Sequence, residues 1–112
     1  MQVEKWQALG NDYLIIEQAS LPWPMTPERV RLLCDPHLGL GADGLLVLAP
    51  PAEAGFVARL TIINPDGSVA ELSGNGARQA ILYLRRAGWT DSREFSIETR
   101  AGEIRAAVAD DR

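Results

Sequence analysis

The stretch of the chain best suited to chemistry is 73–78 (SGNGAR), at the predicted start of the longest helix, 77–87, which Gly88 would end. Small, flexible residues at a helix start leave backbone N–H groups open to an anion, and the helix dipole adds attraction for a carboxylate. An ordinary serine cap, with glycines easing a tight entry, explains the same pattern almost equally well. Two glycines in a first turn cost helix stability, which slightly favours the anion-binding interpretation.

A second glycine-rich run, 39–44 (GLGADG), matches the dinucleotide-binding pattern G-x-G-x-x-G. That pattern grips a pyrophosphate where a strand precedes it and a helix follows. Here the order is inverted, because a predicted helix capped by Thr26 precedes the run and an apolar strand, 45–48, follows it. We therefore reject nucleotide binding and expect a tight turn that needs a positive φ.

Four other residues have a chemistry-bearing side chain without a clear site. Asn11 and Asn64 stand in predicted turns, where asparagine is common for its own backbone hydrogen bonds. His37 is the only histidine, and no cysteine or carboxylate spacing around it resembles a metal site, so we predict no metal. Cys34 lies near the end of an amphipathic helix and is interpreted as a buried apolar residue rather than a nucleophile.

Length and composition narrow the class of protein. The chain has 112 residues, enough for one domain, and a formal net charge of −4, which argues against a nucleic-acid or anionic-membrane surface. One cysteine excludes an internal disulfide. There is no apolar run long enough to span a membrane and no signal-peptide core at the N-terminus, so we expect a cytoplasmic protein.

The predicted elements form an α+β fold, with a mostly antiparallel sheet curled around one central helix. The helix 77–87 is apolar around most of its circumference, which predicts burial. A shorter helix after Thr26, with Pro27 at its first position, would turn Val30, Leu32 and Leu33 inward. The predicted strands are 2–8, 12–18, 45–48, 56–63, 69–72 (paired across a type I turn at 64–67), 95–99 and 104–108.

Four motifs in this order and spacing resemble the N-terminal half of diaminopimelate epimerases: 9–13 (LGNDY), 34–44 (CDPHLGLGADG), 64–68 (NPDGS) and 73–78. The resemblance runs from Val3 to about Val108. It implies that residues 1–112 are the first of two similar domains, each wrapping a sheet around a central helix. The substrate would lie between the domains, and the second domain is absent from this sequence.

The resemblance also implies a reaction. The family interconverts LL- and meso-diaminopimelate, on the route to lysine and peptidoglycan, without pyridoxal phosphate, metal or other cofactor. One cysteine from each domain exchanges a proton at the α-carbon. In this chain the backbone N–H groups of Gly74 and Asn75 would hold the carboxylate, and Asn11 and Asn64 would contact the substrate. The cysteine position of the family is Ser73 here.

This departure keeps three interpretations open. The chain is half of an epimerase that is inactive alone, an elimination (lyase) variant that uses one base, or a non-catalytic half that binds carboxylates or a partner subunit. An isolated half would expose the apolar wall that faces its missing domain, so we expect it to associate with that domain or with a second copy of itself.

Overall fold

The computed structural model describes residues 2–8, 10–70 and 74–108, and its six strands form one open sheet in chain order. None of the described helices is long and apolar enough to cross a membrane. The elements are β1 (Val3–Ala8), β2 (Asn11–Glu17), a 3-10 turn η1 (Gln18–Ser20), α1 (Pro27–Cys34), β3 (Gly44–Ala49), β4 (Ala58–Ile63), α2 (Gly74–Arg86), β5 (Glu94–Thr99) and β6 (Gly102–Ala107).

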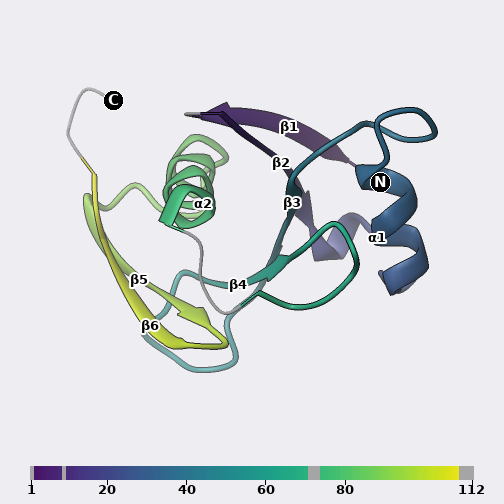
Figure 1. The fold of residues 1–112 in the computed structure, drawn as a ribbon. Helices are drawn as coiled ribbons and strands as arrows, with labels where there is room; N and C mark the ends of the chain where they lie inside the picture. The colour runs from purple at the N-terminus through teal and green to yellow at the C-terminus, as the bar shows by residue number, and fades with distance from the viewer. Residues whose placement is uncertain (1, 9, 71–73, 109–112) are drawn as a thin grey trace.

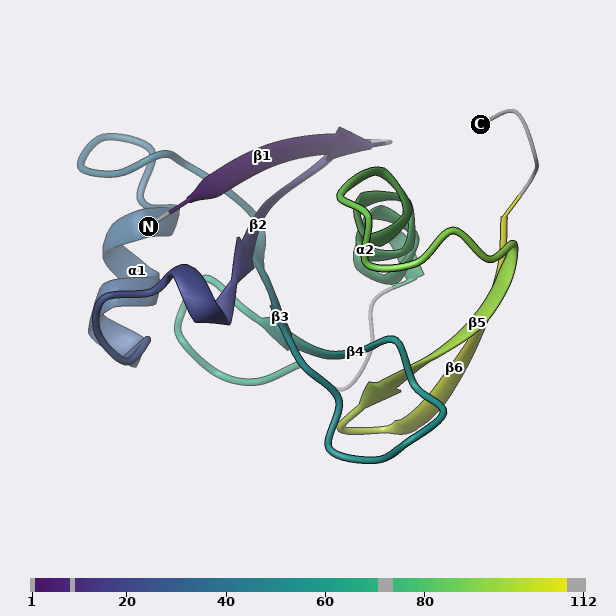
Figure 2. The ribbon, with the colours of Figure 1, turned by 180° about the vertical axis from the view of Figure 1, so that it is seen from behind.

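The sheet is curled around α2 on its inner face, and α1 covers part of its outer face (Figures 1 and 2). Three of the five strand pairings are antiparallel: β1–β2, β3–β4 and β5–β6. The pairings β2–β3 and β4–β5 are parallel, and each needs a crossover connection, one through α1 and the other through α2. The α+β fold and the central helix are confirmed, and the parallel pairings make the sheet mixed.

Strands β2 and β3 are buried on both faces, as the apolar run 45–48 predicted for a central strand. Alternate side chains point to opposite faces of a strand. One set packs inward against α2, and the other packs outward against α1. The inner core includes Ile15, Leu46, Leu48, Leu60, Ala80, Leu84 and Ile97, and the outer core includes Leu14, Ile16, Val30, Cys34, Leu45 and Val47.

Helix α2 begins three residues earlier than predicted, at Gly74, and is buried as predicted. From Gly76 to Arg85 the one exposed side chain is that of Arg78. The predicted end at Gly88 is confirmed, because this glycine has φ +86°. There the Gly88 amide donates to the Arg85 carbonyl (3.3 Å) and the Trp89 amide donates to the Leu84 carbonyl (3.0 Å), the two bonds of a Schellman motif.

The start of α1 is confirmed, with Thr26 Oγ1 accepting a hydrogen bond from the Arg29 amide (3.3 Å) and Pro27 in the first turn. The prediction that Leu32 points inward is wrong, because its side chain is 53% exposed. The buried positions Val30 and Cys34 are four residues apart on one face, and Leu32 lies between them on the opposite face.

Most strand limits differ from the prediction by one or two residues. In the described part of the predicted strand 69–72, Val69 makes a single bridge to Ile63, and residues 71 and 72 lie outside the described residues. The segment from Gln18 to Ser20, partly assigned to a strand, is the short turn η1.

Two leucine substitutions, one in the inner core and one on the exposed face of α1, test this assignment of the core. Leu46 is fully buried, so Leu46→Ala should lower the free energy of unfolding by about 2–5 kcal/mol through lost burial and a cavity. The matched change Leu32→Ala should alter it by less than about 0.5 kcal/mol. Urea unfolding of the two variants checks both values, and a large loss in the Leu32 variant would contradict the exposed position.

Candidate functional site

Asn11 begins β2 and Asn64 directly follows β4, and both lie at the same end of the sheet with β3 between the two strands. Tyr13 in β2 pairs with Gly44, and the next residue of β3, Leu45, pairs with Ile63 in β4. The starts of β2 and β3 and the end of β4 are therefore level with one another. At a strand spacing of about 4.8 Å, β2 and β4 are about 10 Å apart across β3. The register thus brings two of the predicted site residues into one region.

The start of β2 is fixed by a reciprocal pair of hydrogen bonds to Asp43 in the glycine-rich run. The Asp12 amide donates to Asp43 Oδ2 (2.7 Å), and the Asp43 amide donates to the Asp12 carbonyl (2.7 Å). Lys5 lies nearby, with its Nζ 4.0 Å from Asp12 Oδ2. These bonds hold the backbone next to Asn11, which is itself half-buried, in a defined position.

Asn64 opens the predicted turn at 64–67, which is confirmed by the bond from the Gly67 amide to the Asn64 carbonyl (2.9 Å). The Asn64 side chain donates through Nδ2 to Ser68 Oγ (3.0 Å). Asp66 Oδ1 accepts from both Ser68 Oγ and the Ser68 amide, and these bonds lower the pKa of the Asp66 carboxyl. Gly67 has φ +93°, and a Cβ there would lie 2.6 Å from the Cα of Pro27, so the turn packs closely on the start of α1.

The start of α2 approaches this end of the sheet from β4. The Ala70 amide donates to the Ile62 carbonyl (2.8 Å), and α2 begins four residues later, at Gly74. Four residues span at most about 14 Å, so the helix start cannot lie far from Ala70. The first backbone N–H groups of a helix, here those of Gly74 and Asn75, have no partner inside the helix. Ser73 lies outside the described residues.

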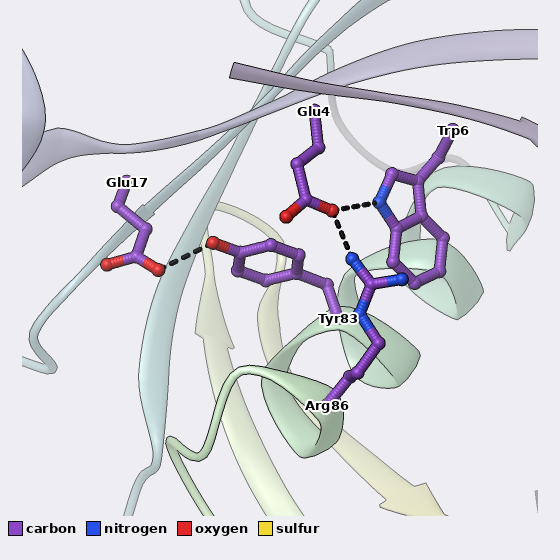
Figure 3. A network of polar contacts seen from close by, with 5 residues as sticks. All are labelled: Glu4, Trp6, Glu17, Tyr83 and Arg86. Carbon is purple, nitrogen blue, oxygen red and sulfur yellow. Dashed lines mark hydrogen bonds and ion pairs between the residues drawn. The ribbon is translucent and has the colours of Figure 1, made fainter. Parts of the chain in front are cut away.

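The opposite end of α2 is tied to β1 and β2 by two carboxylates (Figure 3). Glu17 Oε2 accepts from the Tyr83 hydroxyl (2.5 Å) and from Trp89 Nε1 (3.3 Å). Burial, together with the negative charge of Glu17, raises the pKa of the Tyr83 phenol far above its usual range.

The second carboxylate, Glu4, accepts from Trp6 Nε1 (3.0 Å) and from the Arg86 guanidinium, which stacks over the Trp6 ring at 4.8 Å. These contacts were not expected from the sequence, in which Tyr83 belongs to the predicted apolar helix 77–87 and Trp6 to a predicted strand. The sequence held one signal for these contacts. Trp6 and Tyr83 are aromatic residues that carry a hydrogen-bond donor, and the predicted strands contain the acidic residues Glu4 and Glu17.

The glycines of the run 39–44 lie in the backbone turn between α1 and β3. A helix therefore precedes the run and a strand follows it, which is the inverted order that argued against a nucleotide site. Gly41 has φ +70°. A Cβ at Gly39 would lie 2.0 Å from the Leu32 carbonyl oxygen, and a Cβ at Gly44 would lie 2.8 Å from that of Ile63. One glycine therefore supplies a left-handed conformation, and two permit close approach of backbones.

Cys34 is 6% exposed, which confirms the predicted burial. Burial and, to a smaller extent, the charge of Asp43 raise the pKa of its thiol, which disfavours the nucleophilic thiolate. His37 lies exposed in the loop after α1. Within the described ranges, no group of three or more histidine, cysteine or acidic side chains is arranged to hold a metal ion.

Comparison with known proteins identifies the family. The model of the family described as Diaminopimelate epimerase matches residues 3–112, nearly the whole chain. The chain belongs to the diaminopimelate epimerase family. It is 46% identical over 110 residues to diaminopimelate epimerase 2 of Nostoc sp. strain PCC 7120, covering 98% of this chain and 38% of that protein. It is 42% identical over 107 residues to the diaminopimelate epimerase of Azoarcus sp. strain BH72, covering 96% and 39%.

This diaminopimelate epimerase family chain thus spans less than two-fifths of the length of these relatives. Its fold is also found in solved structures of other proteins. The crystal structure of a methylitaconate-delta-isomerase is 13% identical, with a TM-score of 0.66 over 89% of this chain and 56% of that one. That likeness supports the fold alone.

The hydrogen bond from Tyr83 in α2 to Glu17 in β2 predicts that Tyr83→Phe makes the protein less stable. The phenol donates to a carboxylate in a mostly buried setting, so its removal should lower the free energy of unfolding by about 1.5–3 kcal/mol. As a control, Glu94→Gln weakens an exposed ion pair with Arg105 and should cost less than about 1 kcal/mol. Equal effects in chemical denaturation would show that the Glu17–Tyr83 bond does not hold the helix.

The environment of Cys34 predicts slow alkylation. At pH 8, iodoacetamide should modify the folded chain at least about tenfold more slowly than the urea-unfolded chain, because burial limits access and the raised pKa leaves little thiolate. Mass spectrometry of timed samples gives both rates. Similar rates would contradict the buried thiol.

Proposed function

We propose that the complete protein containing these residues is a cofactor-independent amino-acid epimerase that interconverts LL- and meso-diaminopimelate, with residues 1–112 as its N-terminal domain. The observation that supports this proposal is the short link between β4 and α2. In a chain of this family, α2 begins four residues after Ala70, whose amide bonds to Ile62 near the end of β4. The expectation of a cytoplasmic location rests on the sequence alone.

In the proposed reaction, the helix start binds the α-carboxylate of the substrate. The N–H groups of Gly74 and Asn75 donate to carboxylate oxygens, and the helix dipole favours the charge that builds up when the α-proton leaves. Asn11 and Asn64 contact the rest of the substrate from the neighbouring strand ends. A base on each side of the α-carbon completes the exchange, one of them from the domain that follows.

Ser73 makes the base on this side weak. A free thiol has a pKa of about 8.5, and the helix start can lower the pKa by roughly 1.5 units, to about neutral. A serine hydroxyl starts several units higher and would need a partner base, as in a Ser–His pair. The single histidine of the sequence, His37, lies exposed in the loop after α1. We therefore infer that proton exchange from this side is slow.

The serine also supports a second candidate, an elimination enzyme of the same fold. With one effective base, contributed by the following domain, the protein would remove a proton from one side and expel a leaving group. A non-catalytic half that binds carboxylates would show neither exchange nor elimination.

We further propose that an isolated 1–112 chain associates with the missing domain or with a second copy. Leu38 is 77% exposed and Leu40 is 53% exposed, and a hollow of about 560 Å³ beside β3 and β4 is lined largely by apolar side chains such as Trp23, Met25 and Ile63. Sedimentation velocity should show a concentration-dependent rise in mass. A clean monomer at high concentration would contradict this proposal.

Deuterium exchange tests the reaction. The complete protein is incubated in D₂O separately with LL- and meso-diaminopimelate, and deuterium at the α-carbon is measured by mass spectrometry. We expect slow incorporation for the configuration whose proton faces Ser73. Ser73→Cys should accelerate that exchange by roughly 10²-fold or more, the usual contribution of a positioned base.

Two outcomes would contradict this account of Ser73. Fast exchange of both configurations by the wild-type protein would mean that Ser73 does not limit the reaction. An olefinic product from a diaminopimelate derivative that carries a leaving group, without epimerisation by Ser73→Cys, would favour the elimination enzyme instead.

A further inference from the structure

Gln79 in α2 is a buried polar side chain without a hydrogen-bond partner. Its residue is 2% exposed, and neither Oε1 nor Nε2 has a partner in this structure. Buried carboxamides are normally paired, because leaving their donors and acceptors unsatisfied costs free energy. An unpaired, enclosed group therefore points to a partner that is acquired in another state of the protein.

The contacts of α2 along β1 indicate which part of the molecule Gln79 faces. Arg86 pairs with Glu4, and one turn earlier the Tyr83 ring meets the Trp6 ring at a centroid distance of 6.2 Å. In these two contacts, a step back along the helix is thus matched by a step forward along β1 (Figure 3). One further turn back is Gln79, and two residues after Trp6 in β1 is Ala8.

Ala8 pairs with Asn11 in the strand register, so the sequence of contacts leads from Gln79 to the end of the hairpin that carries Asn11. Helical side chains also tilt toward the N-terminus of their helix and cover the preceding turn. The carboxamide of Gln79 is therefore expected to lie over the first turn of α2, on the side of the helix that faces the β1–β2 hairpin.

We propose that Gln79 is a positioning residue whose carboxamide, in the ligand-bound protein, hydrogen-bonds the Asn11 end of the β1–β2 hairpin to the first turn of α2. This inference rests on the proposed function, since the ligand is the amino-acid carboxylate held at the helix start. A bond that forms only in the bound state adds to affinity for the ligand, because a ligand shifts an equilibrium by its differential interaction with the two states.

Gln79→Met tests this role, because methionine keeps the length and approximate volume of the side chain and removes its hydrogen-bonding groups. Thermal unfolding of the complete protein is measured with and without meso-diaminopimelate, together with the kcat and KM of α-proton exchange. Without ligand, the melting temperature should be unchanged or higher, because an unsatisfied group has been removed. The apparent Kd and KM should rise about tenfold, the loss of one hydrogen bond, with kcat within about twofold.

Leu82→Met is the matched control, because it places the same side chain on a partly buried position of the same helix. It should leave Kd and KM unchanged. Affinity equal to wild type in Gln79→Met would overturn the proposal. A lower ligand-free melting temperature in Gln79→Met would also overturn it, since the carboxamide would then already have a partner, such as a buried water. If diaminopimelate fails to stabilise even the wild-type protein, the proposed function itself is rejected.

Discussion

The burial of α2 inside the curled sheet is the constraint on which the rest of the structure depends. Ala80 and Leu84 are fully buried against the inner core, and Glu17 fixes the far end of the helix through Tyr83 and Trp89. A helix held in this way has little freedom to slide or rotate. Its first turn is therefore presented at a fixed place, which is the requirement for a preorganised anion site.

The pairing of the strands decides which residues share one end of the sheet. Because β2 and β3 are parallel, both begin at the same end of the sheet, and the antiparallel β4 ends there. Asn11, Asp43 and Asn64 are distant in sequence and become neighbours through this register. The glycine-rich run belongs to the same arrangement, since Gly39 lets the chain pass close to α1 and Gly44 lets β3 begin close to the end of β4.

Local chemistry in the sequence was enough to predict several elements. Thr26 and Pro27 mark the start of α1, Gly88 marks the end of α2, and the apolar run 45–48 indicates a strand covered on both faces. Strand orientation was not predictable, because an apolar pattern is the same for parallel and antiparallel neighbours.

Other features depend on contacts that are far apart in sequence. The exposure of Leu32 follows from which face of α1 meets the sheet, and α2 begins at Gly74 despite the low helix propensity of Gly74 and Gly76. The order of the motifs was sufficient to predict the family. The unpaired carboxamide of Gln79 could be recognised only in three dimensions.

The central claim is that the first amides of α2 bind an amino-acid carboxylate, and amide NMR measures this most directly. The ¹⁵N-labelled complete protein is titrated with meso-diaminopimelate and, separately, with its bis-amide, which lacks the carboxylates. The account predicts saturable shifts that are largest at the Gly74 and Asn75 amides with the acid and absent with the amide. Unchanged Gly74 and Asn75 resonances at saturating acid, with shifts elsewhere in the protein, would contradict it.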